Sequence, residues 1–181
     1  MSSAELKIVK SNGKVDTYEE YGNSWGGHAF IWDSIYKTYL KNPTIEYDNW
    51  MTSDNQQKLW DSYKDPKIPT WVRTVMCSTF DHAIVEFDKL IEYADMLDMY
   101  SKEFGNPERV DHLPAWAKAC RDIHKKGEAK GICFYATSVS DDPWCDFNEE
   151  SEEYDLYDIN TGDKHFFVFE SMEDISKEIS E

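Results

Sequence analysis

A long stretch without a single Lys or Arg, residues 131–163, constrains the fold of this chain more than any other feature of its sequence. The stretch carries ten acidic residues and thus more than half of the formal net charge of −17. Like charges at this density repel one another and destabilise a compact state. The fold must therefore either leave the stretch in solvent or use its charge. The ten acids are Asp141, Asp142, Asp146, Glu149, Glu150, Glu152, Glu153, Asp155, Asp158 and Asp163.

The overall charge limits the partners of the chain, since 36 Asp and Glu residues outnumber 19 Lys and Arg residues. Affinity for DNA or RNA comes largely from Lys and Arg side chains that neutralise phosphates, so direct nucleic-acid binding is disfavoured. Anionic membrane surfaces are disfavoured for the same reason. Basic proteins and metal cations are the partners that this charge attracts.

Length and composition indicate one folded domain that spans residues 1–181. The 40% apolar content, with seven Trp, eleven Tyr and nine Phe, is too aromatic for a disordered chain. No apolar run approaches the roughly 18 residues of a membrane span, and the first residues lack the pattern of a secretory signal. Four cysteines without such a signal predict reduced thiols in a cytoplasmic protein.

The expected secondary structure places strands at both ends of the chain and helices in its middle. Asn12-Gly13 between two strand-like runs is a strong hairpin signal, and apolar residues at three- and four-residue spacing indicate helices. This segregated order predicts an α+β fold with a helical centre, one long helix and a small, mainly antiparallel sheet from N- and C-terminal hairpins. The expected elements are a hairpin of residues 6–10 and 15–18, helices at 28–41, 53–63, 70–104 and 114–126, a strand at 132–137, a hairpin of residues 154–159 and 165–169, and a helix that begins at about residue 171.

The longest expected helix, residues 70–104, carries acidic residues on the side opposite its apolar stripe, although a break near Ser78-Thr79 would divide it. A row of carboxylates on a rigid helix imitates a row of phosphates, because Lys and Arg side chains engage both. We therefore expect this row to contact a basic partner, and an ordinary solvated helix face is the alternative. The expected contacts are Asp81, Asp88, Glu92 and Asp95, with Glu103 further along the same line.

The acidic stretch is the second expected contact surface. Trp144 lies inside it, and a Trp surrounded by polar residues is typical of a protein-binding hot spot. The alternatives are a Trp144 that anchors the loop in the core and a mobile acidic loop that only aids solubility. The expected contacts are Asp141, Asp142, Trp144, Asp146, Glu149, Glu150, Glu152 and Glu153.

The glycine-rich segment before the first expected helix leaves room for a catalytic interpretation. Residues 22–26 fit the letters Gly-x-Ser-x-Gly, which would make Ser24 a nucleophile and His28 its base. No strongly apolar strand precedes the segment, however, and the five-letter pattern is common by chance. A tight turn with Trp25 packed against the protein is the favoured interpretation.

Zinc binding is the other chemical alternative. Cys120 and His124 are four residues apart on an expected helix, and Cys133 and Cys145 would complete a Cys₃His set. The sequence contains no Cys-x₂-Cys knuckle, which weakens this interpretation. We assign no catalytic residue, metal or cofactor.

The sequence thus favours a non-enzymatic, acidic binding or inhibitor protein that occupies the basic, nucleic-acid-binding site of a partner protein, with DNA or RNA mimicry as the extreme form. In composition, the chain resembles small acidic proteins that viruses and mobile elements use to block nucleic-acid-binding host or defence proteins. A small enzyme with a site near Ser24 and His28, or with the zinc set, is one alternative. An immunity or adaptor protein that binds one toxin or host factor is another.

Overall fold

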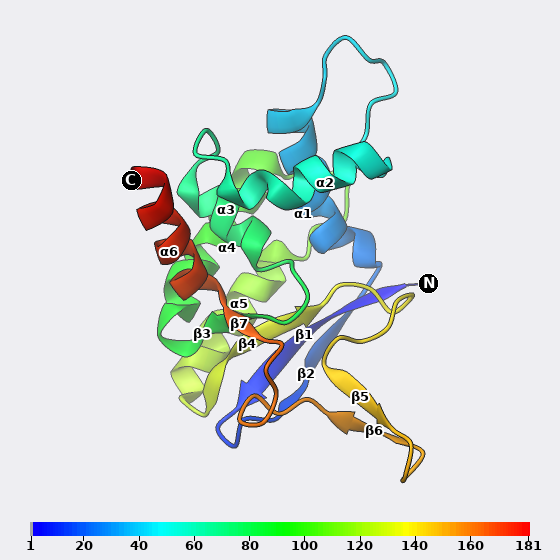
Figure 1. Ribbon diagram of the computed structural model, residues 1–181, viewed down its shortest axis with the longest axis vertical. Coiled ribbons are helices and arrows are strands. Elements are labelled where there is room, and N and C mark those ends of the chain that lie inside the picture. Colours follow the sequence, from blue (N-terminus) through cyan, green and yellow to red (C-terminus); the bar gives the residue numbers. More distant parts are fainter. Residues whose placement is uncertain (1) are drawn as a thin grey trace.

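The computed structural model describes residues 2–181 and shows the expected α+β fold (Figure 1). Its main sheet has five strands in the order β2-β1-β4-β3-β7, and every pairing is antiparallel except that of β3 with β7. A separate hairpin is formed by β5 and β6. The strands are β1 (Ser3–Lys10), β2 (Val15–Gly22), β3 (Ala83–Glu86), β4 (Ala129–Tyr135), β5 (Cys145–Asn148), β6 (Glu153–Leu156) and β7 (Phe166–Phe167).

The N-terminal hairpin is confirmed, and its turn depends on glycine. Gly13 has a φ of +90°, which side-chain-bearing residues rarely adopt. A Cβ atom at this position would also lie only 2.1 Å from Nδ2 of Asn160. The Asn160 side chain donates a hydrogen bond to the carbonyl of Asn12 (2.7 Å), so the hairpin turn is tied to a distant loop.

The helices gather on one side of the sheet (Figure 1). Three expected helices are confirmed, at 28–41, 53–63 and 114–126, and the first of them ends in a π-helical turn, Tyr36–Leu40. The helices are α1 (His28–Ile35), α2 (Ser53–Asp61), α3 (Thr70–Cys77), α4 (Leu90–Phe104), α5 (Leu113–Lys126) and α6 (Val168–Ser180).

The expected continuous helix over residues 70–104 is wrong, because it is divided into α3, β3 and α4. The Ser78 and Thr79 hydroxyls donate to the carbonyls of Val75 and Met76 at 2.7 Å, and this local bonding competes with helix continuation. His82 then adopts a φ of 62°. The following Ala-Ile-Val run pairs with β4 inside the sheet, where β-branched residues pack well.

The expected C-terminal hairpin of residues 154–169 is also wrong. β6 pairs antiparallel with β5, the strand that precedes it in the chain, while β7 pairs in parallel with β3. The segment between them docks elsewhere, since the Ile159 N–H donates to the Gly13 carbonyl (3.0 Å). Helix α6 begins at Val168, before the expected position, because the Glu86 carboxylate accepts the N–H groups of Phe169 and Glu170 at 3.1 and 2.9 Å.

The central strands β1, β3 and β4 are largely buried on both faces, whereas edge strand β2 is largely exposed. Alternate strand residues such as Leu6, Val85 and Phe134 pack against the helices in the larger core. Their neighbours point the other way, where Val9, Val15, Ile84 and Cys133 form a second, smaller core with Trp144 and Tyr157. The second core therefore depends on side chains that the acidic stretch supplies.

Candidate protein-binding surface

The acidic stretch crosses the face of the sheet opposite the helices and is anchored there by Trp144. The side chain of Trp144 is only 1% exposed, and its indole N–H donates to the carbonyl of Phe134 at 2.8 Å. The expectation that Trp144 contacts a partner is therefore wrong for the folded chain. Anchoring in the core, the alternative drawn from the sequence, is what the structure shows.

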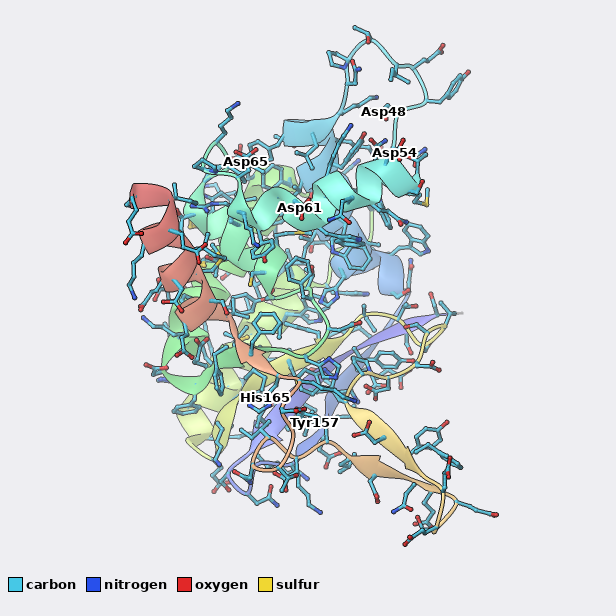
Figure 2. All side chains as sticks on the ribbon, viewed as in Figure 1. Asp48, Asp54, Asp61, Asp65, Tyr157 and His165 are labelled. Carbon is cyan, nitrogen blue, oxygen red and sulfur yellow. The ribbon has the colours of Figure 1, made fainter. Side chains whose placement is uncertain are left out.

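Tyr157 is the second anchor of the stretch. Its hydroxyl lies 3.0 Å from Nδ1 of His165 and accepts a hydrogen bond from the Lys164 N–H (3.1 Å) (Figure 2). Its backbone N–H donates to the Trp144 carbonyl, and its ring meets that of Trp144 edge-on at 5.5 Å. Burial lowers the pKa of His165, so this imidazole is held in its neutral form.

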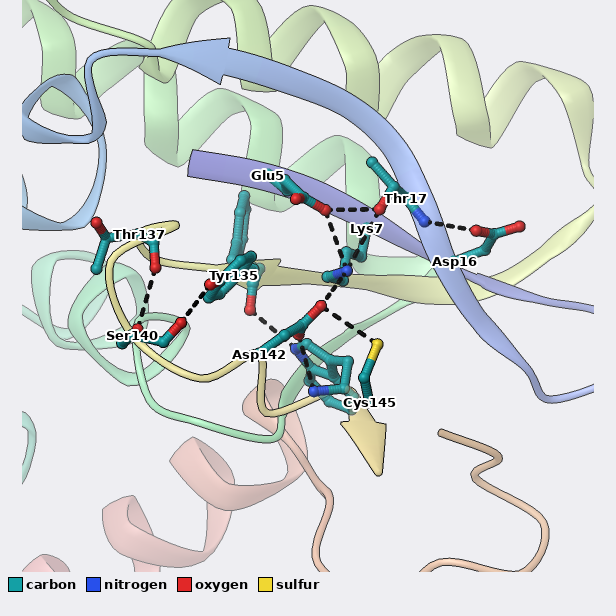
Figure 3. Close-up of polar contacts among 11 residues, drawn as sticks. Glu5, Lys7, Asp16, Thr17, Tyr135, Thr137, Ser140, Asp142 and Cys145 are labelled. Carbon is teal, nitrogen blue, oxygen red and sulfur yellow. Dashed lines mark hydrogen bonds and ion pairs between the residues drawn. The ribbon is translucent and has the colours of Figure 1, made fainter. Parts of the chain in front are cut away.

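A buried ion cluster holds the loop before β5 (Figure 3). The Lys7 ammonium lies 2.7 Å from the Asp142 carboxylate and 3.1 Å from that of Glu5, and Lys7 is only 3% exposed. Burial lowers the pKa of Lys7, but the hydrogen bonds and charges of Asp142 and Glu5 outweigh burial and raise it. Asp142 also accepts a hydrogen bond from the Cys145 thiol at 3.4 Å. Asp142 therefore has a structural partner inside the protein.

Between the anchors, the β5–β6 hairpin projects away from the rest of the molecule (Figure 1). An isolated two-stranded hairpin is marginally stable at best, so this one depends on Trp144 and Tyr157 for its position. Asp146 lies directly opposite Asp155, and this like-charge pairing is partly offset because Lys164 lies 3.6 Å from Asp146 and the Asn148 amide donates to Asp155 at 2.8 Å. The turn, residues 149–152, and the first residue of β6 are exposed and carry four glutamates, the turn glutamates Glu149, Glu150, Glu152 and Glu153.

Two aromatic side chains lie exposed on the hairpin beside the acids. Phe147 faces Tyr154 across the strands with ring centroids 5.3 Å apart, and the two are 55% and 72% exposed. They border a cleft of about 560 Å³ together with Tyr135, Asp141 and Asp146. Neither Phe147 nor Tyr154 was among the contacts expected from the sequence, although each alternates with polar residues in the strand on its side of the turn.

The second expected acidic surface is not one helix face. Asp81 lies in the turn before β3, and Asp88 lies in the short 3-10 turn before α4. Glu92 and Asp95 are on α4, where Glu92 lies 3.5 Å from Lys89 and Asp95 lies 2.7 Å from Arg121. The predicted rod of carboxylates is therefore wrong, because the helix that would align them is divided. Contact of these residues with a partner stays a prediction.

The Ser24–His28 alternative lacks the hydrogen bond that a nucleophile and its base require. The Ser24 hydroxyl bonds to the Ser2 hydroxyl at 2.7 Å, and neither nitrogen of His28 has a hydrogen-bond partner among residues 2–181. The segment is a tight turn, as expected, but Trp25 is 58% exposed rather than packed down. Close packing explains why residue 27 of this turn is a glycine, since a Cβ on Gly27 would lie only 2.7 Å from the Trp116 ring.

The four residues of the zinc alternative are dispersed. Cys120 lies in the larger core and Cys133 in the smaller one, while the ring of His124 stacks on Phe87 at 5.1 Å. The Cys145 thiol donates a hydrogen bond to the Asp142 carboxylate. Within the described part of the chain, no group of three or more His, Cys, Asp or Glu residues is arranged to hold a metal ion.

Comparisons with protein-family models, curated proteins and solved structures found no match. None of the helices in residues 2–181 is long and apolar enough to cross a membrane.

Proposed function

We propose that the protein is a non-enzymatic, cytoplasmic binding protein that presents its β5–β6 hairpin to a basic, nucleic-acid-binding site on a partner protein. The observation that carries this proposal is the placement of the charge. The acids of the turn project into solvent on an anchored hairpin, and no Lys or Arg lies between residues 131 and 163. The hairpin therefore offers a basic site a surface that is almost entirely negative, with Lys164, 3.6 Å from Asp146, as the one cation paired with its strands among the described residues.

Two further features suit the hairpin to binding. Phe147 and Tyr154 add exposed aromatic surface inside a polar rim, the composition that is typical of interface hot spots. The anchors Trp144 and Tyr157 fix both ends of the hairpin, so less conformational entropy is lost when it binds. A site built to hold a nucleic-acid backbone carries Lys and Arg, and the carboxylates of the hairpin pair with these side chains as phosphates do.

Neutralising the turn tests this proposal. In the first variant, Glu149, Glu150, Glu152 and Glu153 are all changed to Gln, and the free energy of unfolding should change little because all four side chains are exposed. Association with partners captured from a cell lysate should slow about tenfold or more at low salt, and its salt dependence should flatten. Surface plasmon resonance at several salt concentrations measures both quantities.

A matched control separates the hairpin from the overall charge. Changing Glu170, Glu173, Glu178 and Glu181 to Gln removes the same charge from exposed positions in and after α6. The control variant should associate at nearly the rate of the unmodified protein. Equal rates for both variants, or binding that ignores salt, would contradict the proposal.

A further inference from the structure

The cleft beside the β5–β6 hairpin has aromatic walls as well as acidic ones. It has a volume of about 560 Å³, and the rings of Tyr135, Phe147 and Tyr154 line it. The rings of Phe147 and Tyr154 are exposed and therefore open to a ligand. The electron-rich face of an aromatic ring attracts a cation, and this attraction is stronger where water is displaced. The cleft thus suits a positively charged group that also has a flat surface.

The hairpin face that borders the cleft is the one turned away from Lys164. Residues two apart in a strand point to the same face, so Cys145 and Phe147 share one face and Asp146 points to the other. The Cys145 thiol lines the cleft and donates to Asp142, which directs this face toward the loop before β5. Lys164 lies 3.6 Å from Asp146 and does not line the cleft. No Lys or Arg of the described chain lines it.

Behind one wall, the cleft surroundings already hold a cation (Figure 3). The Lys7 ammonium lies 2.7 Å from the Asp142 carboxylate and 5.7 Å from the centroid of the Tyr135 ring, within cation–π range. Lys7 offsets only part of the local charge, since Glu5, Asp141 and Asp142 supply three negative charges against one positive. Burial raises the pKa of the Tyr135 hydroxyl, and the neighbouring carboxylates raise it further against the opposing effect of Lys7. The cleft therefore remains negative.

Asp141 is the carboxylate that remains for an incoming cation. Both oxygens of Asp142 have partners within the protein, because Oδ1 accepts the Trp144 N–H at 2.9 Å and Oδ2 pairs with Lys7. Asp141 is exposed, lines the cleft and forms no ion pair within residues 2–181. An unpaired carboxylate beside exposed rings supplies both parts of a site for a flat cation.

We propose that this cleft binds an arginine side chain of the partner, whose guanidinium stacks on the exposed rings of Phe147 and Tyr154 and pairs with Asp141. The inference rests on the proposed function, in that the partner is the basic protein to which the hairpin is presented. A guanidinium is planar and weakly hydrated, stacks on aromatic faces and donates two parallel hydrogen bonds to a carboxylate. The ammonium of lysine is a strongly hydrated point charge, so it gains less from the rings. The cleft volume falls within the roughly 300–1,000 Å³ of small-ligand pockets and admits a whole side chain.

Two matched peptides test the choice of arginine. Acetyl-Gly-Arg-Gly-Arg-Gly-amide and its counterpart with two lysines carry the same charge, and NMR titration of the labelled protein gives a dissociation constant for each. The arginine peptide should bind about fivefold more tightly. Its δ-methylene protons should shift upfield, because they lie over aromatic faces. Equal affinities, or no binding of the arginine peptide, would overturn the inference.

Paired variants place the interaction in the cleft. Phe147→Leu combined with Tyr154→Leu keeps apolar surface and removes both ring faces, so the preference for arginine should disappear while the thermal unfolding midpoint changes little. Tyr47→Leu removes a ring that is 84% exposed and lies outside the cleft, and it should keep the preference. Asp141→Asn should weaken arginine binding about threefold, whereas Glu173→Gln on α6 should not. A preference that survives the loss of both rings would show that the cleft does not cause it.

The turn glutamates separate this inference from the proposed function. They do not line the cleft, so changing all four to Gln should weaken both peptides alike and leave the arginine preference at about fivefold. Equal binding of the two peptides that weakens in this variant would overturn the arginine site and leave the charge-based function standing. A partner that keeps its nucleic acid would contradict the proposed function, while an arginine preference that depends on the two rings would still support the cleft.

Discussion

Replacing Trp144 with Ala should lower the free energy of unfolding by about 3–5 kcal/mol, the range for removing a large buried aromatic side chain. Trp144 is 1% exposed in the smaller core, and its loss leaves a cavity beside Tyr157 and Cys133. The carbonyl of Phe134 also loses the indole N–H that bonds it at 2.8 Å. Urea unfolding followed by circular dichroism measures the effect.

The same variant should release the hairpin. With one anchor removed, amide hydrogens of residues 145–156 should exchange faster with solvent, while those of β1 and β4 change less. Trp25→Ala is the matched control, since Trp25 is 58% exposed and its loss should change stability by about 0.5 kcal/mol or less. A loss below about 1 kcal/mol for Trp144→Ala would show that the acidic stretch is not anchored as described.

Replacing Lys7 with Met should destabilise the protein by about 3 kcal/mol, because the carboxylates of Glu5 and Asp142 then face each other without a counter-charge. This value is the lower end of the range for breaking a buried ion pair. It is chosen because the two carboxylate side chains are 19% and 20% exposed and keep some contact with water. Chemical denaturation at neutral pH gives the value.

A compensated variant shows whether charge is the cause. Adding Glu5→Gln and Asp142→Asn to Lys7→Met removes the unpaired charges and should restore stability to within about 1 kcal/mol of the original. If the triple variant is no more stable than the single one, lost packing rather than charge explains the effect.

The Lys7 cluster also has a defined pH dependence. Because the pKa of Lys7 is raised in the folded state, its contribution is fully present below the ordinary value of 10.5 and is lost as the pH rises through the folded value. The stability difference between the unmodified protein and the triple variant should therefore be constant from about pH 7 to pH 10 and shrink only above that range.

Local signals in the sequence predicted much of this fold. Asn12-Gly13 fixes the N-terminal hairpin through a backbone conformation that glycine adopts readily, and such a signal needs no tertiary context. Residues 83–86 were misassigned because Ala83, Ile84 and Val85 continue the helical spacing of the apolar residues around them. Pairing with β4, more than forty residues away, decides in favour of a strand, and spacing alone does not reveal that pairing.

The charge of the candidate surface was predicted from the sequence, but the contacts that anchor the acidic stretch to the sheet were not. The glutamates of the turn are exposed as the composition suggested. Trp144 has polar neighbours in the sequence, yet its partner is the Phe134 carbonyl across the fold. Lys7 alternates with apolar residues in β1 and resembles a solvent-facing position, while its counter-charge Asp142 lies far along the chain. Long-range contacts of this kind cannot be read from local patterns.

Competition with nucleic acid tests the central claim most directly. A partner captured through the hairpin is first bound to fluorescently labelled DNA or RNA, and the protein is then added while the anisotropy of the label is followed. We expect the anisotropy to fall to that of free nucleic acid near one equivalent of protein, and to fall much less with the variant that has Gln in place of the four turn glutamates. A partner that binds the protein and keeps its nucleic acid, in a larger complex of higher anisotropy, would contradict the claim.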